Sequence, residues 1–91
     1  MSVITRIFWT PWARKHIWDR HKVETDEVDE ACFGAVILLR VLERRHLVYG
    51  RSESGRYLCV VVILMSSGQA RVITARDATR AERRRWFKKG K

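Results

Sequence analysis

The feature that most constrains the fold is a run of nine apolar residues at 57–65, with the sequence Tyr-Leu-Cys-Val-Val-Val-Ile-Leu-Met. The run is far shorter than the roughly 20 residues that a transmembrane helix needs, which argues against a membrane protein. Because it is apolar on both faces, it predicts the central strand of a sheet. A chain of 91 residues has room for one small core, and we expect a single domain over residues 1–91.

Shorter segments around this run have the pattern of an α+β fold. Further strands are predicted at 3–9, 35–43, 46–51 and 69–76. Turn sequences at 52–55 (Ser-Glu-Ser-Gly) and 66–68 (Ser-Ser-Gly) separate the later strands. Strands joined by tight turns indicate a meander, and we expect an antiparallel β-sheet of about four to five strands.

Three local signals predict where helices begin. They are a capping residue followed by proline, a threonine followed by acids, and the T-x-x-E spacing of a capping box. The residues are Thr10 with Pro11, Thr25 with Asp26 and Glu27, and Thr79 with Glu82. The first helix is expected to end near His21, and the last is expected to fray over residues 87–91.

Basic residues outnumber acidic ones by 19 to 10, which gives a formal net charge of +9. Residues 71–91 hold nine basic and two acidic side chains, so seven of the nine units lie in that segment. This excess favours a polyanionic partner, either nucleic acid or an acidic protein surface. A solvated basic face is the ordinary alternative for any single arginine.

The two cysteines, Cys32 and Cys59, lie in apolar surroundings without a C-x-x-C motif or a Cys/His cluster. We therefore predict two buried thiols, no metal site and no cofactor. No secretory signal is visible at the N-terminus, which indicates a cytoplasmic protein without a membrane partner.

Three segments of the chain form a recognisable ordered set. They are HIWDRHKV at 16–23 leading into EVDE at 27–30, VYGRSESGRYL at 48–58, and VITARDATRAERR at 72–84. Taken in this order, they resemble the BrnT family, the toxin components of bacterial type II toxin-antitoxin modules. The last is similar to the family's A-R-x-A-T-x-x-E-R-R ending. One departure is Lys22, which stands where the family has glycine and so removes an easy left-handed helix terminator.

The resemblance implies a fold like that of the RelE and ParE toxins, with N-terminal helices packed on an antiparallel sheet and a C-terminal helix. It also implies a ribonuclease that inhibits translation and is neutralised by a cognate antitoxin that itself binds DNA. The expected partners are RNA and the antitoxin, with DNA reached only through the antitoxin. A homodimer within the toxin-antitoxin assembly stays open.

Metal-free RNA cleavage needs a base for the 2′-hydroxyl, an acid for the leaving oxygen, and positive charge at the phosphorane-like transition state. Histidines are the side chains best suited to proton transfer near neutral pH. The predicted catalytic residues are His16, His21, Arg76 and Arg80. The residues predicted to bind RNA phosphate are Arg51, Arg56, Arg83 and Arg84.

Each of these roles has a structural alternative. His16 lies beside an apolar stripe and can serve packing, and His21 ends a helix, where a cation complements the dipole. Arg51 and Arg56 flank a turn, where they can pair with Glu53.

The capping box and the tryptophans also admit two interpretations. Glu82 is better explained as the capping partner of Thr79 than as a catalytic base. The tryptophans can stack on bases, but in a small domain we interpret them as core anchors. They are Trp9, Trp12, Trp18 and Trp86. Two functions thus stay open, a ribonuclease toxin and a catalytically inactive nucleic-acid- or antitoxin-binding module acting in transcriptional autoregulation.

Overall fold

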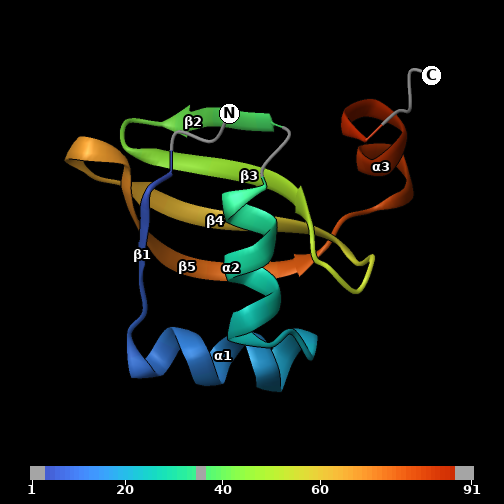
Figure 1. The fold of residues 1–91 in the computed structure, drawn as a ribbon, viewed down its shortest axis with the longest axis horizontal. Coiled ribbons are helices and arrows are strands. Elements are labelled where there is room, and N and C mark those ends of the chain that lie inside the picture. Colours follow the sequence, from blue (N-terminus) through green and yellow to red (C-terminus); the bar gives the residue numbers. More distant parts are fainter. Residues whose placement is uncertain (1–3, 35–36, 88–91) are drawn as a thin grey trace.

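One five-stranded sheet, in the order β1-β5-β4-β3-β2, organises residues 4–34 and 37–87, which the computed structural model describes (Figure 1). The strands are β1 (Arg6–Phe8), β2 (Ile37–Leu42), β3 (Arg45–Arg51), β4 (Tyr57–Leu64) and β5 (Gln69–Asp77). A short 3-10 turn, η1 (Ser66–Gly68), joins β4 to β5. The predicted strand positions 3, 35 and 36, and positions 88–91 of the predicted frayed end at 87–91, lie outside the described residues.

Strands β2 to β5 form the predicted antiparallel meander, but β1 pairs with β5 in parallel. The expectation of an entirely antiparallel sheet was therefore wrong, and the sheet is mixed. Turn sequences specify only the neighbours that they connect. No turn joins β1 directly to β5. The position of β1 in the sheet therefore depends on the free edge that β5 offers once the meander has formed.

The apolar run at 57–65 lies in β4, which is the central strand as predicted. Successive side chains of a strand point to opposite faces of the sheet. On one face Leu58, Val60 and Val62 are fully buried in the core. On the other face Val61 and Ile63 are only half-buried, so this face is less covered than the first.

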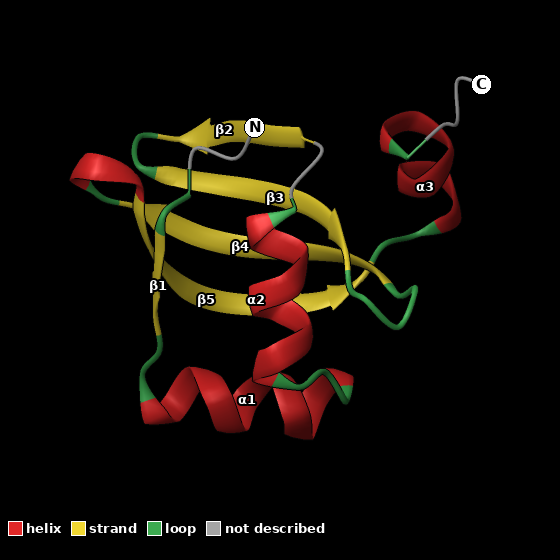
Figure 2. Ribbon diagram, in the orientation of Figure 1, coloured by secondary structure: helices red, strands yellow, loops and turns green. Residues whose placement is uncertain are grey.

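Helices α1 (Pro11–His21) and α2 (Thr25–Phe33) cover the first face, where α1 packs on β5 and α2 crosses over β3 and β4 (Figure 2). As predicted, Thr10 caps α1 by accepting a hydrogen bond from the Ala13 N–H. The predicted start of α2 is also confirmed, although its capping residue is Glu24 and not Thr25.

Helix α2 lies so close to β3 that the sheet has no room for a side chain at Gly50. A Cβ placed there would lie 1.9 Å from the carbonyl oxygen of Ala31. Only glycine allows this approach of the two backbones.

Helix α3 (Arg80–Trp86) differs from the other two because it buries none of its residues. It lies beyond the end of the sheet, away from α1 and α2 (Figure 1). Its start is the predicted capping box, in which Thr79 accepts from the Glu82 N–H and Glu82 accepts from the Thr79 N–H.

Both cysteines, Cys32 and Cys59, are buried, as predicted. Burial raises the pKa of Cys32 to about 12 and also raises the pKa of Cys59. Among the described helices, none has the length and apolar character needed to cross a membrane.

Candidate functional site

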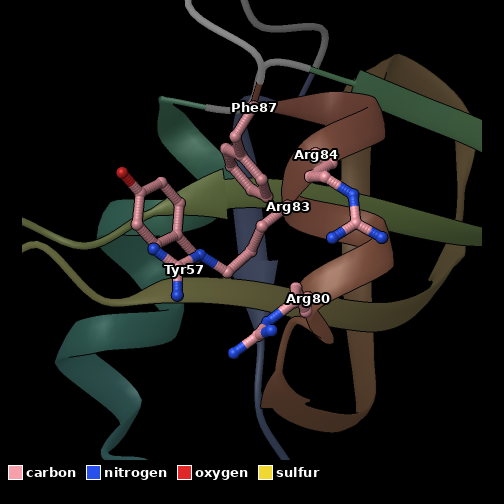
Figure 3. A pocket seen from close by; sticks show the side chains of 5 residues that line it. All are labelled: Tyr57, Arg80, Arg83, Arg84 and Phe87. Carbon is pink, nitrogen blue, oxygen red and sulfur yellow. The ribbon is translucent and has the colours of Figure 1, made fainter.

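Four exposed arginines gather where β3 ends, β4 begins and α3 packs. They are Arg51, Arg80, Arg83 and Arg84, and we call them the arginine cluster. The guanidinium carbons of Arg83 and Arg51 lie 4.3 and 4.8 Å from the centroid of the Tyr57 ring. Figure 3 shows the α3 arginines lining a pocket with Tyr57 and Phe87. None of the four forms an ion pair with another described residue, so their charge is available to an anion.

Aromatic side chains form the floor beneath these charges. The ring of Phe87 meets Tyr57 edge-on with the centroids 4.8 Å apart, and Trp86 stacks on Tyr49 at 5.8 Å. Arginine side chains over aromatic rings keep their guanidinium groups spread and accessible. A surface of this kind can offer stacking to a base and charge to a phosphate.

Arg76 is held differently, because its guanidinium forms a bidentate pair with Glu82. The two N···O distances are 2.7 and 2.9 Å, and the Tyr49 hydroxyl donates to the same carboxylate at 2.5 Å. The Arg76 hydrogen bonds are the main reason that the pKa of Glu82 falls to about 2. Burial, followed by the bond to Glu82, raises the pKa of Tyr49. This network ties α3 to β3 and β5.

The Arg56 guanidinium donates five hydrogen bonds to the rest of the fold. It donates twice to Asp77, at 2.6 and 3.0 Å, and once to Glu27 at 3.1 Å. It also donates to the carbonyl oxygens of Lys22 at 2.8 Å and His21 at 3.2 Å. Its ion pairs are thus with residues of α2 and β5, and the pairing with Glu53 that the turn suggested is wrong for Arg56.

The two candidate histidines lie on α1, on the opposite face of the sheet from the Tyr57 ring. His16 stacks on Trp12 with the ring centroids 4.5 Å apart, and its ring meets that of His21 edge-on at 5.9 Å. His21 reaches the end of the sheet, where its carbonyl accepts from Arg56. The pKa of Asp77 is lowered there mainly by Arg56 and to a smaller extent by His21.

The family model for the ribonuclease toxin BrnT of type II toxin-antitoxin systems matches residues 9–82. The chain belongs to the BrnT family. This confirms the resemblance seen in the sequence, and membership of a type II system implies an antitoxin partner.

The fold agrees with that of a BrnT toxin. The crystal structure of the Brucella abortus ribonuclease toxin BrnT matches with a TM-score of 0.68 and 19% sequence identity, over 84% of this chain and 100% of that chain. No curated protein matches. The likeness to RelE and ParE toxins is not tested by this match and stays a prediction.

The residues predicted for a BrnT site fall into three groups in space. The arginine cluster is brought together around Tyr57, Arg56 and Arg76 are engaged by carboxylates, and the histidines lie across the sheet on α1. Among the described residues, no three His, Cys, Asp or Glu side chains are placed to hold a metal ion.

The sequence did not single out Tyr57 and Phe87, which line the pocket of the arginine cluster, or Tyr49, which is buried beside it. The alternation of side chains along β4 could have indicated Tyr57. Leu58 and Val60 face the core, so Tyr57 and Cys59 point to the opposite face of the sheet. The BrnT match ends at residue 82, so Tyr57 lies inside it and Phe87 beyond it.

Proposed function

We propose that this BrnT-family chain is a metal-independent endoribonuclease that binds RNA at the arginine cluster and inhibits translation by cutting it. The observation that carries the proposal is the group of four exposed arginines around Tyr57 that form no ion pair with a described residue. Arginine suits phosphate because its planar fork gives two parallel hydrogen bonds. The site of action is the cytoplasm.

The chemistry is attack of the 2′-oxygen on the neighbouring phosphorus, which breaks the bond from phosphorus to the 5′-oxygen and leaves a 2′,3′-cyclic phosphate. A base takes the 2′-hydroxyl proton, and an acid protonates the leaving 5′-oxygen. Arg80 and Arg83 stabilise the charge that develops on the phosphorane, and removing one such donor typically costs about 10²–10³ in rate. His21 and His16 are proposed as the groups that transfer these protons. Because they lie across the sheet from the Tyr57 ring, this role requires the scissile phosphate to sit at the end of the sheet, where the His21 carbonyl meets Arg56. Arg76 contributes through Glu82, since their bidentate pair holds α3 and its arginines against the sheet.

The antitoxin neutralises the toxin by covering the same surface. Acidic side chains of the antitoxin satisfy the arginine cluster, which leaves no free charge for RNA. DNA is reached only through the antitoxin.

The test is cleavage of total RNA by the purified protein in EDTA. The double variant Arg80→Ala with Arg83→Ala is expected to cut at least about 100-fold more slowly. Its matched control is Arg44→Ala with Arg45→Ala, which removes the same charge at the opposite end of the sheet and is expected to cut normally. An inactive wild type, or equal loss in both double variants, would contradict the proposal.

A second function is favoured by one observation, the separation of the histidines from the arginine cluster by the sheet. It is the catalytically inactive module that binds RNA or antitoxin in transcriptional autoregulation. The variant His21→Ala distinguishes the ribonuclease from the inactive module. If His21 is catalytic, its removal should slow RNA cleavage by about 10²–10⁴-fold. RNA binding without any cutting by the wild type would favour the inactive module.

A further inference from the structure

The outer face of α1 exposes a large aromatic side chain that the core does not use. Trp12 is 65% exposed and Trp18 is 47% exposed, so the interpretation of both as core anchors is wrong. Trp9 and Trp86 are less exposed, and the Trp9 indole N–H donates to Asp29. Contact of so much apolar Trp12 surface with water is unfavourable, so a ligand that covered this ring would gain binding free energy.

Trp12 is the first ring of a continuous aromatic path along α1. Its indole is nearly parallel to the His16 imidazole, with an interplanar angle of 11°, and His16 in turn contacts His21. Parallel stacking of two flat rings is the geometry in which a nucleobase packs on an aromatic side chain.

The path leads to the proposed RNA site. At its end the His21 carbonyl accepts from Arg56, and Arg56 pairs with Asp77 at the end of β5. Arg80 of the arginine cluster follows Asp77 by three residues. A strand of RNA that leaves the cluster round this end of the sheet therefore meets His21 first, and then His16 and Trp12 farther along α1.

The charge beside Trp12 suits a polyanion. Helix α1 and Lys22, the residue that follows it, carry four basic side chains and one acidic side chain. The acid, Asp19, is already paired with Lys15 at 2.6 Å. Arg20 lines a pocket with Trp12 and His16 and forms no ion pair with the described residues.

We propose that the outer face of α1 is a second RNA-binding surface, on which Trp12 stacks an unpaired base and Arg20 holds a phosphate. The occupant is single-stranded RNA, because bases in a duplex are already stacked and paired. The proposal rests on the proposed function for its ligand. It adds a contact remote from the arginine cluster that only a longer substrate reaches.

Trp18 provides a matched control on the same helix. Its ring is covered by the Lys22 ammonium at 5.2 Å. It also lines a pocket with several carboxylates, which repel a phosphate chain. They are Glu24, Asp26, Glu27, Glu30 and Glu53.

The experiment measures binding of labelled 2′-O-methyl RNA by fluorescence anisotropy, with one oligonucleotide of about 12 nucleotides and one of about 4. Trp12→Ala is expected to weaken binding of the longer RNA about 5- to 150-fold, the usual range for one stacked base. Binding of the short RNA is expected to stay unchanged. Trp12→Phe is expected to keep most of the affinity, and Trp18→Ala all of it.

The proposal is overturned if Trp12→Ala binds the longer RNA as the wild type does, or if Trp18→Ala loses as much. It is also overturned if Trp12→Ala loses only antitoxin binding, which would assign this face to a protein. Cleavage by the wild type in EDTA is measured on the same preparation. Cleavage without dependence on Trp12 refutes only this inference, and Trp12-dependent binding without cleavage refutes only the proposed activity.

Discussion

Lys22 ends α1 in a conformation that favours glycine. Its φ and ψ are 54° and 42°, and its N–H donates to the carbonyl oxygens of Ile17 and Trp18. The left-handed region costs a residue with a Cβ about 1–2 kcal/mol. Lys22 therefore keeps the left-handed turn that the family's glycine would form, and the strained backbone of Lys22 lowers the stability of the fold.

Replacing Lys22 with glycine should raise the free energy of unfolding by up to about 1 kcal/mol. Glycine removes the left-handed penalty of about 1–2 kcal/mol, and its greater freedom in the unfolded chain offsets about 0.4–1 kcal/mol of that gain. Urea denaturation followed by circular dichroism measures the change. Lys22→Ala is the control, because it removes the contact with Trp18 and keeps the penalty. If Lys22→Ala is as stable as Lys22→Gly, the backbone explanation is wrong.

The residue scale also shows what a sequence can reveal about contacts. The capping box of Thr79 and Glu82 was predictable, because its two residues are three positions apart. The bond from Tyr49 to Glu82 spans 33 positions and depends on the fold. For the same reason, no local signal distinguished Arg76, which is paired, from Arg80, which is not.

At the scale of elements, α3 is attached through few contacts. It buries no residue, and it is held by the Glu82 carboxylate and by aromatic contacts of Trp86 and the following Phe87. Because Glu82 receives bonds from both β3 and β5, its ionisation controls how firmly the arginines of α3 are placed.

Acid should therefore loosen α3. The folded pKa of Glu82 is lowered to about 2 from an ordinary value near 4.5, so its contribution to stability is complete above about pH 4.5 and is lost as the pH falls toward 2. The Trp86 indole resonance, followed by NMR between pH 6 and pH 2, reports this change. In Glu82→Gln the transition should be absent at Trp86, and an unchanged profile would contradict the role of this carboxylate.

The strands were largely predictable and their assembly was not. The meander β2 to β5 follows from turn sequences and apolar runs, which act between neighbours in the chain. The parallel pairing of β1 with β5 joins residues more than 60 positions apart, such as Arg6 and Gln69. No local pattern encodes a pairing of this kind.

At the scale of the whole molecule, the position of the charge proved more informative than its amount. Seven of nine positive units were assigned to residues 71–91 from the sequence, and three of the four clustered arginines belong to that segment. The fourth, Arg51, reaches the cluster through the pairing of β3 with β4. Composition predicted a polyanion-binding surface, and only the fold placed Tyr57 within it.

Binding of single-stranded RNA should weaken steeply with salt. Each phosphate contact contributes about −0.7 to the slope of log K against log salt concentration. Arg80→Ala with Arg83→Ala should therefore reduce the magnitude of the slope by about 1.4. Anisotropy titrations between 50 and 300 mM salt measure it, with the Arg44 and Arg45 double variant as control. A slope that is the same for both double variants would place the phosphate contacts elsewhere.

The convergence of three elements on Arg56 has a consequence for genetic screens. Its guanidinium bonds to the end of α1, to α2 and to β5, so Arg56→Ala leaves Glu27 and Asp77 without their cation. Bacteria that survive expression of such a variant would do so because the toxin fails to accumulate. Survivors with changes at Arg80 should still contain normal amounts of the protein, so immunoblots of surviving colonies would separate folding residues from RNA-binding ones.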